Sequence, residues 1–456
     1  MHDRQTSPRL SAWLDRLTER RGNEIRLGLD RLLDVARFMV LPMQDNEVRL
    51  KGLVLTVGGT NGKGSTCAFL ESIALQSGYR VSCYTSPHLF RFQERLRFNG
   101  EELDDQAWEA ALDEVEEARL AAGDIDLSFF EVTTLAAIRI VQGLEPDLAI
   151  FEIGMGGRLD AVNCLASDAA VLTSIDLDHQ AFLGSTRQAI AWEKGHIARR
   201  DCPFILADPS PPEGLLELLE QRQADVWWIG RDFGYEGDKI QWQWWGRSER
   251  RSGLGYPALR GINQLLNASA ALAALSALRH QLAVHQGGVR QGLAQVSLPG
   301  RFQVLPGQPA VVLDVAHNPH AAGVLAANMD QMGFFPKTVA VVGMLADKDA
   351  AAIFARLGGR VDSWCLASLS SQQAGARARL AKELRPFCEG MIAGLSEMER
   401  PVEPVTIFEF DDPESALAHA ASLVGPNDRI VVFGSFVTVA QAWPLAKTLG
   451  QAPHLS

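Results

Sequence analysis

The sequence predicts an α/β protein made of two parallel-sheet domains in series, and three observations predict it. Short apolar runs typical of buried strands alternate with helical patterns along most of the 456 residues. A glycine-rich turn directly follows the strand expected at 53–57. The alternation changes character near 227–256 and resumes beyond Pro299. We therefore expect a larger domain at 1–297 and a smaller one at 298–456.

Length, charge and cysteine usage narrow the class of protein. A chain of 456 residues exceeds one ordinary core, and 47% hydrophobic with 21% charged residues is typical of globular enzymes. The net charge of -12 argues against a nucleic-acid partner. No apolar run reaches the roughly 20 residues that a membrane span needs. The six cysteines contain no C-x-x-C pair, which fits reduced thiols. We expect a cytoplasmic protein.

The larger domain is expected to contain a parallel sheet with helices on both faces. An amphipathic opening at 13–41 precedes strands at 53–57, 81–85, 148–152 and 169–175, with helices at 66–76, 105–121 and 133–142. Residues 227–256 are expected to form a small antiparallel elaboration, followed by an alanine-rich helix at 263–280. We expect its tryptophans, Trp227, Trp228, Trp242, Trp244 and Trp245, to pack in the core rather than to form a ligand platform.

The smaller domain repeats the alternation of strands and helices. Its strands are expected at 311–315, 338–342, 362–366, 405–408 and 429–433. No internal repeat is visible, so the chain is two α/β domains and not an array. A cleft between domains is the expected position of the active site.

The glycine-rich turn has the chemistry of a phosphate-binding loop. Gly-Gly-Thr-Asn-Gly-Lys-Gly-Ser at 58–65 lies between a predicted strand and a predicted helix, so backbone N–H groups can face an anion. Lys63 would meet the β- and γ-phosphates. The loop departs from G-x-x-x-x-G-K-[ST], because Val57 occupies the first glycine position and Gly64 separates Lys63 from Ser65. The alternative is a plain βα turn with a solvent-facing lysine, which the position after a strand disfavours.

Polar residues follow the other predicted strands of this domain. Ser86 lies in Thr-Ser-Pro-His-Leu, Glu152 ends an apolar run, and His179 closes Asp-Leu-Asp-His. Because the carboxyl ends of parallel strands share one edge, these residues can converge beside the loop. A hydroxyl, a carboxylate and an imidazole suit a Mg²⁺ ion that also takes phosphate oxygens and water. Individually they are equally well explained as a turn cap, an ion-paired acid and a core histidine.

Together these motifs resemble the folylpolyglutamate synthase family, specifically its bacterial bifunctional dihydrofolate synthase/folylpolyglutamate synthase branch in the Mur ligase superfamily. The resemblance covers residues 11–443 and rests on several independent motifs in order: 59–65, the Ser-Pro-His-Leu segment, 152–163 and Asp178-His179. It implies an N-terminal P-loop ATPase domain and a smaller, Rossmann-like C-terminal ligase domain.

The resemblance also implies the metal and catalytic residues. Ser86, Glu152 and His179 match the family's protein ligands for two Mg²⁺ ions, with His179 chiefly a ligand. Lys194 matches a lysine that the family carbamylates, and a desolvated amine with a depressed pKa can capture CO₂. The alternative for Lys194 is an ordinary lysine on a helix surface. Lys63, His179 and Lys194 are therefore the expected catalytic residues.

For ATP, the resemblance implies binding residues in both domains. The matching positions are Thr60, Asn61, Gly62, Lys63, Gly64, Ser65, Asn267, Arg301, Asp314 and His317. We therefore expect ATP to bridge the domains, so that closure couples nucleotide binding to assembly of the active site.

For the pterin substrate, three segments match the family. They comprise Arg26, Leu27, Gly28 and Leu29; Ser128, Phe129, Phe130 and Glu131; and Leu159, Asp160 and Ala161. An aromatic ring such as Phe130 can stack on a pterin, and the Asp160 carboxylate can accept its ring donors. Phe129 and Phe130 are alternatively core residues. The chain departs from the family at Val162, where Thr is common, and at Asn263, where His often precedes Gln264.

The implied activity is ATP-dependent amide ligation. A substrate carboxylate is phosphorylated by ATP, and the amine of L-glutamate displaces phosphate from the acyl phosphate. Dihydropteroate would give dihydrofolate, and tetrahydrofolate would gain a polyglutamate chain, placing the enzyme in folate biosynthesis and one-carbon metabolism. We expect a monomer, and a monovalent-cation requirement stays open. The rivals are a cell-wall Mur ligase, whose N-terminal substrate domain has no room before Leu53, and a P-loop switch module without ligation.

Overall fold

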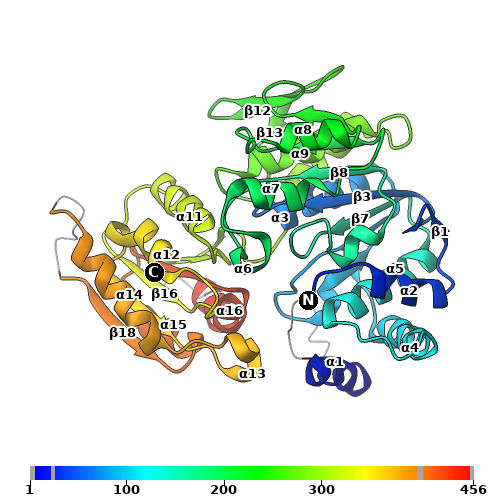
Figure 1. Cartoon of the computed structure of the whole chain (residues 1–456). Helices are drawn as coiled ribbons and strands as arrows, with labels where there is room; N and C mark the ends of the chain where they lie inside the picture. Colours follow the sequence, from blue (N-terminus) through cyan, green and yellow to red (C-terminus); the bar gives the residue numbers. More distant parts are fainter. Residues whose placement is uncertain (1–5, 22–25, 398–403, 452–456) are drawn as a thin grey trace. The chain divides into compact units, whose positions relative to one another are not determined.

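The computed structural model describes residues 6–21, 26–397 and 404–451, and these form two compact units (Figure 1). The first unit runs to Ala258 and includes Asn263–Ser297, while the second contains Leu259–Ile262 and the chain from Leu298 onward. The short segment Leu259–Ile262 belongs to the second unit because the Ile262 N–H donates to Asn328 Oδ1 at 2.8 Å. None of the described helices is long and apolar enough to cross a membrane.

An eight-stranded sheet forms the centre of the first unit. Its strands, in spatial order, are β10 (Asp225–Trp228), β9 (Pro203–Leu206), β8 (Ala169–Leu172), β3 (Leu53–Gly58), β7 (Leu148–Glu152), β4 (Val81–Tyr84), β5 (Leu96–Phe98) and β6 (Glu101–Glu102). All neighbours from β10 to β4 are parallel, and β5 and β6 add an antiparallel edge. The inner strands are buried throughout, as expected for a parallel sheet covered on both faces.

Helices cover both faces of this sheet. The core of one face includes residues of α1 (Pro8–Arg21), α2 (Asp30–Phe38), α4 (Asp105–Ala121), α5 (Phe129–Leu144), α7 (Arg187–Gly195) and α8 (Leu215–Gln221). A second group, α3 (Lys63–Gln76), α9 (Gln264–Ala277) and α10 (Gln286–Gln295), packs together, and α3 and α9 also pack on strands of the sheet. Figure 1 shows α9 and α4 on opposite sides of it. The expected amphipathic opening is thus two helices, with residues 22–25 outside the described part.

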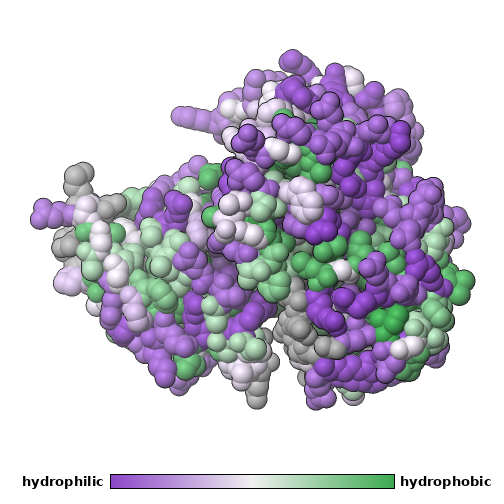
Figure 2. Space-filling view, viewed as in Figure 1, coloured by the Kyte–Doolittle hydropathy of each residue, from purple (hydrophilic) through white to green (hydrophobic). Residues whose placement is uncertain are grey.

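The smaller strands and turns complete the first unit. They are the hairpin β1 (Met43–Gln44) and β2 (Glu47–Val48), the turn η1 (Phe92–Arg95), the turn η2 (Ala161–Cys164), the helix α6 (Gln180–Leu183), and the antiparallel β11 (Gly234–Gly237), β12 (Gln241–Trp245) and β13 (Arg250–Gly255). On the face shown in Figure 2, hydrophilic residues cover most of the region around α8, α9 and β13.

The tryptophan-rich stretch is divided between two sheets, which corrects the sequence prediction. Trp227 and Trp228 belong to β10, a parallel edge strand of the main sheet, because residues of β10 pair with β9. Only residues from Gly234 onward form the expected antiparallel elaboration. The side chains of Trp242 and Trp244 are almost completely buried, as expected for packing residues.

The second unit is a six-stranded, mainly parallel sheet. Its spatial order is β14 (Gln303–Leu305), β15 (Ala310–Leu313), β19 (Arg429–Phe433), β16 (Thr338–Val342), β17 (Ser363–Ala367) and β18 (Thr406–Phe410), with only β14 antiparallel. Its helices and turns are α11 (Pro319–Gln331), α12 (Ala350–Leu357), η3 (Gly358–Arg360), α13 (Ser371–Ala374), η4 (Gly375–Arg377), α14 (Ala381–Gly394), α15 (Pro413–Ser422) and α16 (Phe436–Gln451). The core shared by α11, α12 and α14 lies on one face, while α15 and α16 pack together.

Two differences between expected and observed boundaries bear on the active site. Helix α3 begins at Lys63 rather than at Thr66, so the phosphate loop ends directly in a helix. Strand β8 ends at Leu172 rather than at Ile175, because the next residues turn aside and bond to the phosphate loop. Elsewhere α4, β16, β7 and β19 have the expected bounds.

Candidate active site

The functional motifs of the first unit meet at one edge of its sheet. Strands β8, β3, β7 and β4 are adjacent and parallel, so the segments that follow them leave from the same edge. The phosphate loop follows β3, Glu152 ends β7, Ser86 lies just beyond β4, and His179 lies beyond β8. This edge is the candidate active site.

Glycine is required at two positions of the phosphate loop. Gly59 and Gly62 have φ values of 143° and 89°, a backbone region that other residues rarely adopt. A Cβ on Gly59 would collide with the Thr173 hydroxyl, and one on Gly62 would lie 2.5 Å from Asn267 Oδ1. Asn267, which the resemblance assigns to ATP binding, therefore packs directly against the loop.

A segment after β8, residues 173–176, holds the phosphate loop by hydrogen bonds. The Thr60 N–H donates to Ser174 O at 2.6 Å, and the Thr60 hydroxyl bonds to both backbone groups of Asp176 at 3.0 Å. The Asn61 N–H donates to Ser174 Oγ at 3.0 Å, and Thr173 Oγ1 donates to Asn61 O at 2.6 Å. The loop conformation therefore depends on this neighbouring segment.

Lys63 is the first residue of α3 and turns back over the loop. Its ammonium donates to Gly59 O at 3.1 Å and to Thr60 O at 3.3 Å. Gly64 and Ser65 follow in the first helical turn, where backbone N–H groups lack partners within the helix. A cation and a helix N-terminus thus meet at the loop, which is an arrangement that suits phosphate.

Lys194 of α7 lies against the same loop. Its side chain is 4% exposed, and its ammonium donates to Gly59 O at 3.0 Å. Burial and the charge of Lys63 together lower the pKa of Lys194 to about 7, against the opposing charges of Asp178 and Asp160. The amine is therefore partly neutral at physiological pH. The alternative of a solvent-exposed lysine on a helix surface is wrong.

Ser86 and Glu152 are neighbours across the sheet edge. The Ser86 N–H donates to Glu152 Oε2 at 3.2 Å, and Glu152 is 4% exposed. Burial lowers the pKa of Arg95 in η1, and the nearby charge of Glu152 opposes this change. Because a carboxylate has further acceptor positions, a bond to Ser86 leaves Glu152 chemically able to bind a cation as well.

His179 begins the short helix α6 with a left-handed backbone, φ 50°. Its side chain is 27% exposed, and its Nε2 atom lies 4.0 Å from Asp178 Oδ1. Helix α6 packs near the loop after Glu152, because a Cβ on Gly156 would lie 2.9 Å from Leu183. The three expected ligands offer hydroxyl, carboxylate and imidazole donors, which fit Mg²⁺ held jointly with phosphate oxygens.

No group of three or more His, Cys, Asp or Glu side chains in the described part of the chain is arranged to hold a metal ion. The six cysteines all lie in that part and are free thiols, as expected. Five are buried and Cys202 is partly exposed.

The three segments assigned to the pterin lie together. The Gly28 N–H donates to Leu159 O at 3.1 Å, which joins the first segment to the third. Arg26 pairs with Asp126 at 2.7 Å, just before the second segment. The structure thus brings together positions that are about 100 residues apart in the sequence. Leu27 and Leu29 flank Gly28 in the first segment, and Ala161 follows Asp160 in the third.

Two of the expected pterin residues have a clear structural role. Ser128 and Glu131 cap α5 reciprocally: Glu131 Oε2 accepts from the Ser128 N–H at 2.8 Å, and Ser128 Oγ accepts from the Glu131 N–H at 3.3 Å. Arg31 pairs with the other Glu131 oxygen at 2.9 Å. Their side chains therefore stabilise the start of α5.

Phe130 and Asp160 border the same region. Phe130 is half-buried, and its ring occupies the space that a Cβ on Gly154 would need, at 2.6 Å. Phe129 lies at the edge of the core, with the Arg95 guanidinium 5.4 Å from its ring centre. Asp160 is 3% exposed and accepts from the Met155 and Val162 N–H groups at 2.8 and 3.0 Å. Burial raises the pKa of Asp160 to about 6.

The expected ATP residues of the second unit form their own cluster. Asp314 follows β15 and accepts from the Phe302 N–H at 3.0 Å and the Ala316 N–H at 2.8 Å. Desolvation raises the pKa of Asp314 to about 6, against the opposing charge of Arg301. The Arg301 guanidinium lies 5.2 Å from the Phe436 ring centre, and the His317 ring lies 6.2 Å from it.

The sequence did not predict the residues of the neighbouring 173–176 segment that hold the phosphate loop by hydrogen bonds. Thr173 and Ser174 contact it directly, and Arg187 and Asp208 hold the segment in turn. Only the polar run Thr-Ser-Ile-Asp at the end of an apolar strand, at 173–176, indicated that this strand end was unusual. Arg187 and Asp208 carry no local pattern at all.

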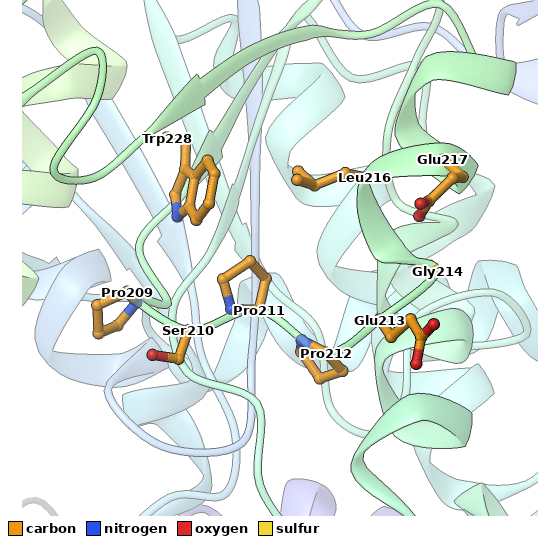
Figure 3. Close-up of a pocket in the computed structure, with 9 residues that line it drawn as sticks. All are labelled: Pro209, Ser210, Pro211, Pro212, Glu213, Gly214, Leu216, Glu217 and Trp228. Carbon is orange, nitrogen blue, oxygen red and sulfur yellow. The ribbon is translucent and has the colours of Figure 1, made fainter.

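A separate cavity of about 320 Å³ lies beyond the carboxyl ends of β9 and β10. It is lined by Pro209, Ser210, Pro211, Pro212, Glu213, Gly214, Leu216, Glu217 and Trp228. Figure 3 shows Trp228 and Leu216 on opposite sides with Pro211 between them. The Trp228 indole N–H donates to Asp208 O at 3.0 Å, which ties this cavity wall to the strand end.

Comparison with known proteins agrees with this architecture. Residues 300–436 match the family model "Mur ligase, glutamate ligase domain", which defines the class of the second unit. The dihydrofolate synthase/folylpolyglutamate synthase of Escherichia coli K12 is 38% identical over 437 residues, covering 96% of this chain and 95% of that protein. This chain therefore belongs to the dihydrofolate synthase/folylpolyglutamate synthase family, as its motifs predicted, and is an ATP-dependent ligase.

Solved structures support the same assignment over the whole chain. The structure of E. coli FolC in complex with DHPP and ADP has a TM-score of 0.85 and 35% identity, covering 98% of this chain and 99% of that one. A crystal structure of a bifunctional folylpolyglutamate synthase/dihydrofolate synthase with Mn, AMPPNP and L-glutamate bound has a TM-score of 0.82 and 36% identity, covering 97% and 99%. The expected two-domain α/β fold is confirmed.

Proposed function

We propose that the chain adds L-glutamate to dihydropteroate, forming dihydrofolate, and to tetrahydrofolates, forming folylpolyglutamates. The observation that carries the proposal is the meeting of a glycine-rich loop, Lys63 and the buried Lys194 at one sheet edge. The family of the chain and its relatives with ADP, AMPPNP, DHPP and L-glutamate supply the substrate classes. The expectations of a monomer and of a cytoplasmic location stay predictions.

The reaction is two successive transfers. The substrate carboxylate attacks the γ-phosphorus of ATP, a P–O bond breaks, and an acyl phosphate and ADP result. The amine of glutamate then attacks the acyl carbon, phosphate leaves, and the nitrogen loses a proton. A carboxylate is a poor acylating agent, and phosphorylation supplies the leaving group. Lys63 neutralises charge on the transferring phosphoryl group.

Residues 60–65 are the proposed phosphate-binding loop, with Asn267 beside it. The loop offers backbone N–H groups of Gly64 and Ser65 at a helix start, and Lys63 as the cation. Arg301, Asp314 and His317 are the proposed nucleotide residues of the second unit, where a guanidinium and a carboxylate suit phosphate and hydroxyl groups.

Ser86, Glu152 and His179 are the proposed Mg²⁺ ligands, with two ions as the finer proposal. Bound Mg²⁺ supplies charge neutralisation at the phosphates. Of the three ligands, we expect Glu152 to contribute most to Mg²⁺ affinity. It is a buried carboxylate, and Mg²⁺ is usually bound through carboxylate oxygens. Glu152→Gln keeps the acceptor for Ser86 but loses the charge, so it should raise the Mg²⁺ concentration for half-maximal rate; an unchanged titration contradicts this role.

Lys194 is the proposed site of carbamylation. Its amine, with a pKa lowered to about 7, has a neutral fraction that can attack CO₂. A C–N bond forms, the nitrogen loses a proton, and the side chain becomes an anionic carbamate. The neighbouring ammonium of Lys63 stabilises that negative charge. Lys194 would thus change from a second cation to an anion beside the phosphate loop.

The pterin is proposed to bind where the three segments meet, near Phe130 and Asp160. The half-buried Phe130 ring provides a stacking surface, and the Asp160 carboxyl can pair with ring N–H groups. Since burial raises the pKa of Asp160 to about 6, a bound cation or donor would favour its ionised form.

The test is phosphate release by the purified chain with MgATP, measured with each substrate omitted in turn. We expect release only when a pterin and L-glutamate are both present, with dihydropteroate and with tetrahydrofolate. Release that ignores pterin and glutamate would indicate a nucleotide-hydrolysing module instead. Loss of the response to dihydropteroate alone would remove the dihydrofolate synthase activity.

A further inference from the structure

A pair of charged residues outside the proposed ligand sites holds both backbone groups of Ile175. Asp208 Oδ2 accepts from the Ile175 N–H at 2.9 Å, and Arg187 Nε donates to Ile175 O at 2.8 Å. The two side chains also pair with each other, Arg187 Nη2 to Asp208 Oδ2, at 3.1 Å. We call this arrangement of Arg187 and Asp208 the Ile175 clamp.

The Ile175 clamp is linked to the phosphate loop through the residues on either side of Ile175. Ser174 and Asp176, the two neighbours of Ile175, make the hydrogen bonds that hold Thr60 and Asn61. A shift of Ile175 therefore moves the groups that orient the loop. Because phosphate binding depends on the direction of loop N–H groups, displacements well below 1 Å matter there.

Two different elements contribute to the clamp and fix it in place. Arg187 is the first residue of α7, the helix that also carries Lys194, whose ammonium bonds to Gly59 O. Helix α7 thus contacts the loop through its last turn and holds the loop's support through its first. Asp208 is 5% exposed, lies just beyond β9, and accepts from the Ser210 N–H at 2.9 Å.

We propose that Arg187 and Asp208 are positioning residues for the nucleotide, acting through Ile175 and the 173–176 segment on the phosphate loop. The inference rests on the proposed role of residues 60–65 in binding ATP. The hydrogen bonds that hold Thr60 and Asn61 come from residues of the 173–176 segment and not from Arg187 or Asp208. Their loss should therefore weaken ATP binding more than binding of pterin or glutamate.

The opposite end of the same sheet offers a matched control. Arg49 pairs with Asp168 at 2.8 Å, and Asp168 Oδ2 accepts from the Val54 N–H at 2.8 Å. This pair also clamps a backbone N–H of the sheet, and the Arg49 side chain is 36% exposed against 39% for Arg187. It lies at the amino end of β3, so it should support folding without orienting the loop.

The variants are Asp208→Asn and the milder Arg187→Lys, compared with the control Asp168→Asn. Asparagine replaces one acceptor oxygen by a donor, and lysine loses the planar group that bonds to Ile175 and Asp208 together. For each variant we would measure KM for ATP, glutamate and pterin, kcat, ADP affinity by calorimetry, and melting temperature.

We expect KM for ATP and the Kd for ADP to rise about tenfold in Asp208→Asn, and less in Arg187→Lys, from loss of about one charge-assisted hydrogen bond. The KM values for glutamate and pterin should change less than about twofold. Asp168→Asn should lower the melting temperature similarly while leaving ATP binding unchanged. Equal effects on ATP in the clamp and control variants, or no effect in the clamp variants, would overturn the inference.

Lys63→Ala separates this inference from the proposed function. If Lys63→Ala abolishes turnover while the clamp variants bind ATP normally, the loop assignment stands and the positioning role fails. If Lys63→Ala turns over normally, the loop is not the nucleotide site and the proposed function fails with it. Joint substitution of Arg187 and Asp208 should be less than additive, because both act on Ile175.

Discussion

The carboxyl edges of the two sheets hold similar aspartates beside different cations. Asp160 in the first unit and Asp314 in the second each accept two backbone N–H groups, and desolvation raises the pKa of both to about 6. The charge facing Asp160 comes from Lys63, whereas that facing Asp314 comes from Arg301. A lysine can lose its proton in a protein, but an arginine keeps its charge.

A cation of the first edge, Lys194, can therefore lose its charge near neutral pH, whereas the Arg301 cation of the second edge cannot. Lys194, the second lysine of the first edge, has a pKa lowered to about 7. Of the residues compared, Lys194 is the one that can supply a neutral amine near neutral pH. The second unit offers a permanent cation, which suits holding an anionic ligand. Four predictions test this division.

The largest effect is expected from Lys63→Ala. Removing the ammonium beside the loop should reduce kcat by at least about 100-fold, since charge on the transferring phosphoryl group loses its cation. Steady-state phosphate release would measure it. Lys51→Ala is the control, because Lys51 is 72% exposed and pairs with Glu145 at the surface. Similar activities in the two variants would contradict the assigned role.

Lys194→Ala should lose almost as much activity, and acetate should restore part of it. The truncated side chain leaves buried space in which a small carboxylate can replace the proposed carbamate. The rate would be followed against acetate concentration at constant ionic strength. Acetate should not rescue Lys63→Ala, because that variant lacks a cation. Equal rescue of both variants would argue against carbamylation.

Arg301→Ala should act on ATP binding and not on the chemical step. We expect KM for ATP to rise about tenfold, because the variant loses one permanent cation that would bind the anionic ligand. The value of kcat should stay within about threefold of that of the wild type. Initial rates against ATP concentration give both constants. Arg360→Ala, which removes a surface partner of Asp330 in the same unit, should change neither. A fall in kcat alone would place Arg301 in the chemistry instead.

The smallest effect is on the pH dependence of stability. The folded-state pKa values of Asp160 and Asp314 lie above the ordinary 3.8, so their protonated forms favour folding. This stabilisation is complete below about pH 4 and is lost as pH rises to and through about 6.

Chemical unfolding of the wild type and of Asp160→Asn and Asp314→Asn would measure this pH effect. Asparagine cannot ionise, so each variant should gain stability relative to wild type between about pH 4 and 6. The gain should be about 3 kcal/mol at each position, because both pKa values lie at about 6 against the ordinary 3.8. Parallel pH profiles for wild type and variants would contradict the raised pKa values.

Local patterns in the sequence were enough for much of the fold and for the parts of the site. The buried runs at 338–342 and 429–433 predicted two strands to the residue, since a parallel strand covered on both faces is apolar throughout. The glycine-rich turn predicted a phosphate loop because glycine is needed where the backbone adopts positive φ, as Gly59 and Gly62 do.

Other features depended on pairing between distant segments, which leaves no local pattern. Trp227 and Trp228 were grouped with the antiparallel strands, yet they join the main sheet because β9 offers a free edge to β10. Ser128 and Glu131 carry the spacing of a helix cap, which competes with a ligand role that only the resemblance suggested.

The sequence by itself determined the family, the order of strands and helices, and the chemical groups of the site, because these follow from residue type and spacing. Only the tertiary structure decided that Lys194 is buried against Gly59, and that Arg187 and Asp208 hold Ile175 behind the phosphate loop. Burial and hydrogen bonding of such residues arise when segments distant in the sequence pack together, and that packing sets their pKa values and positions.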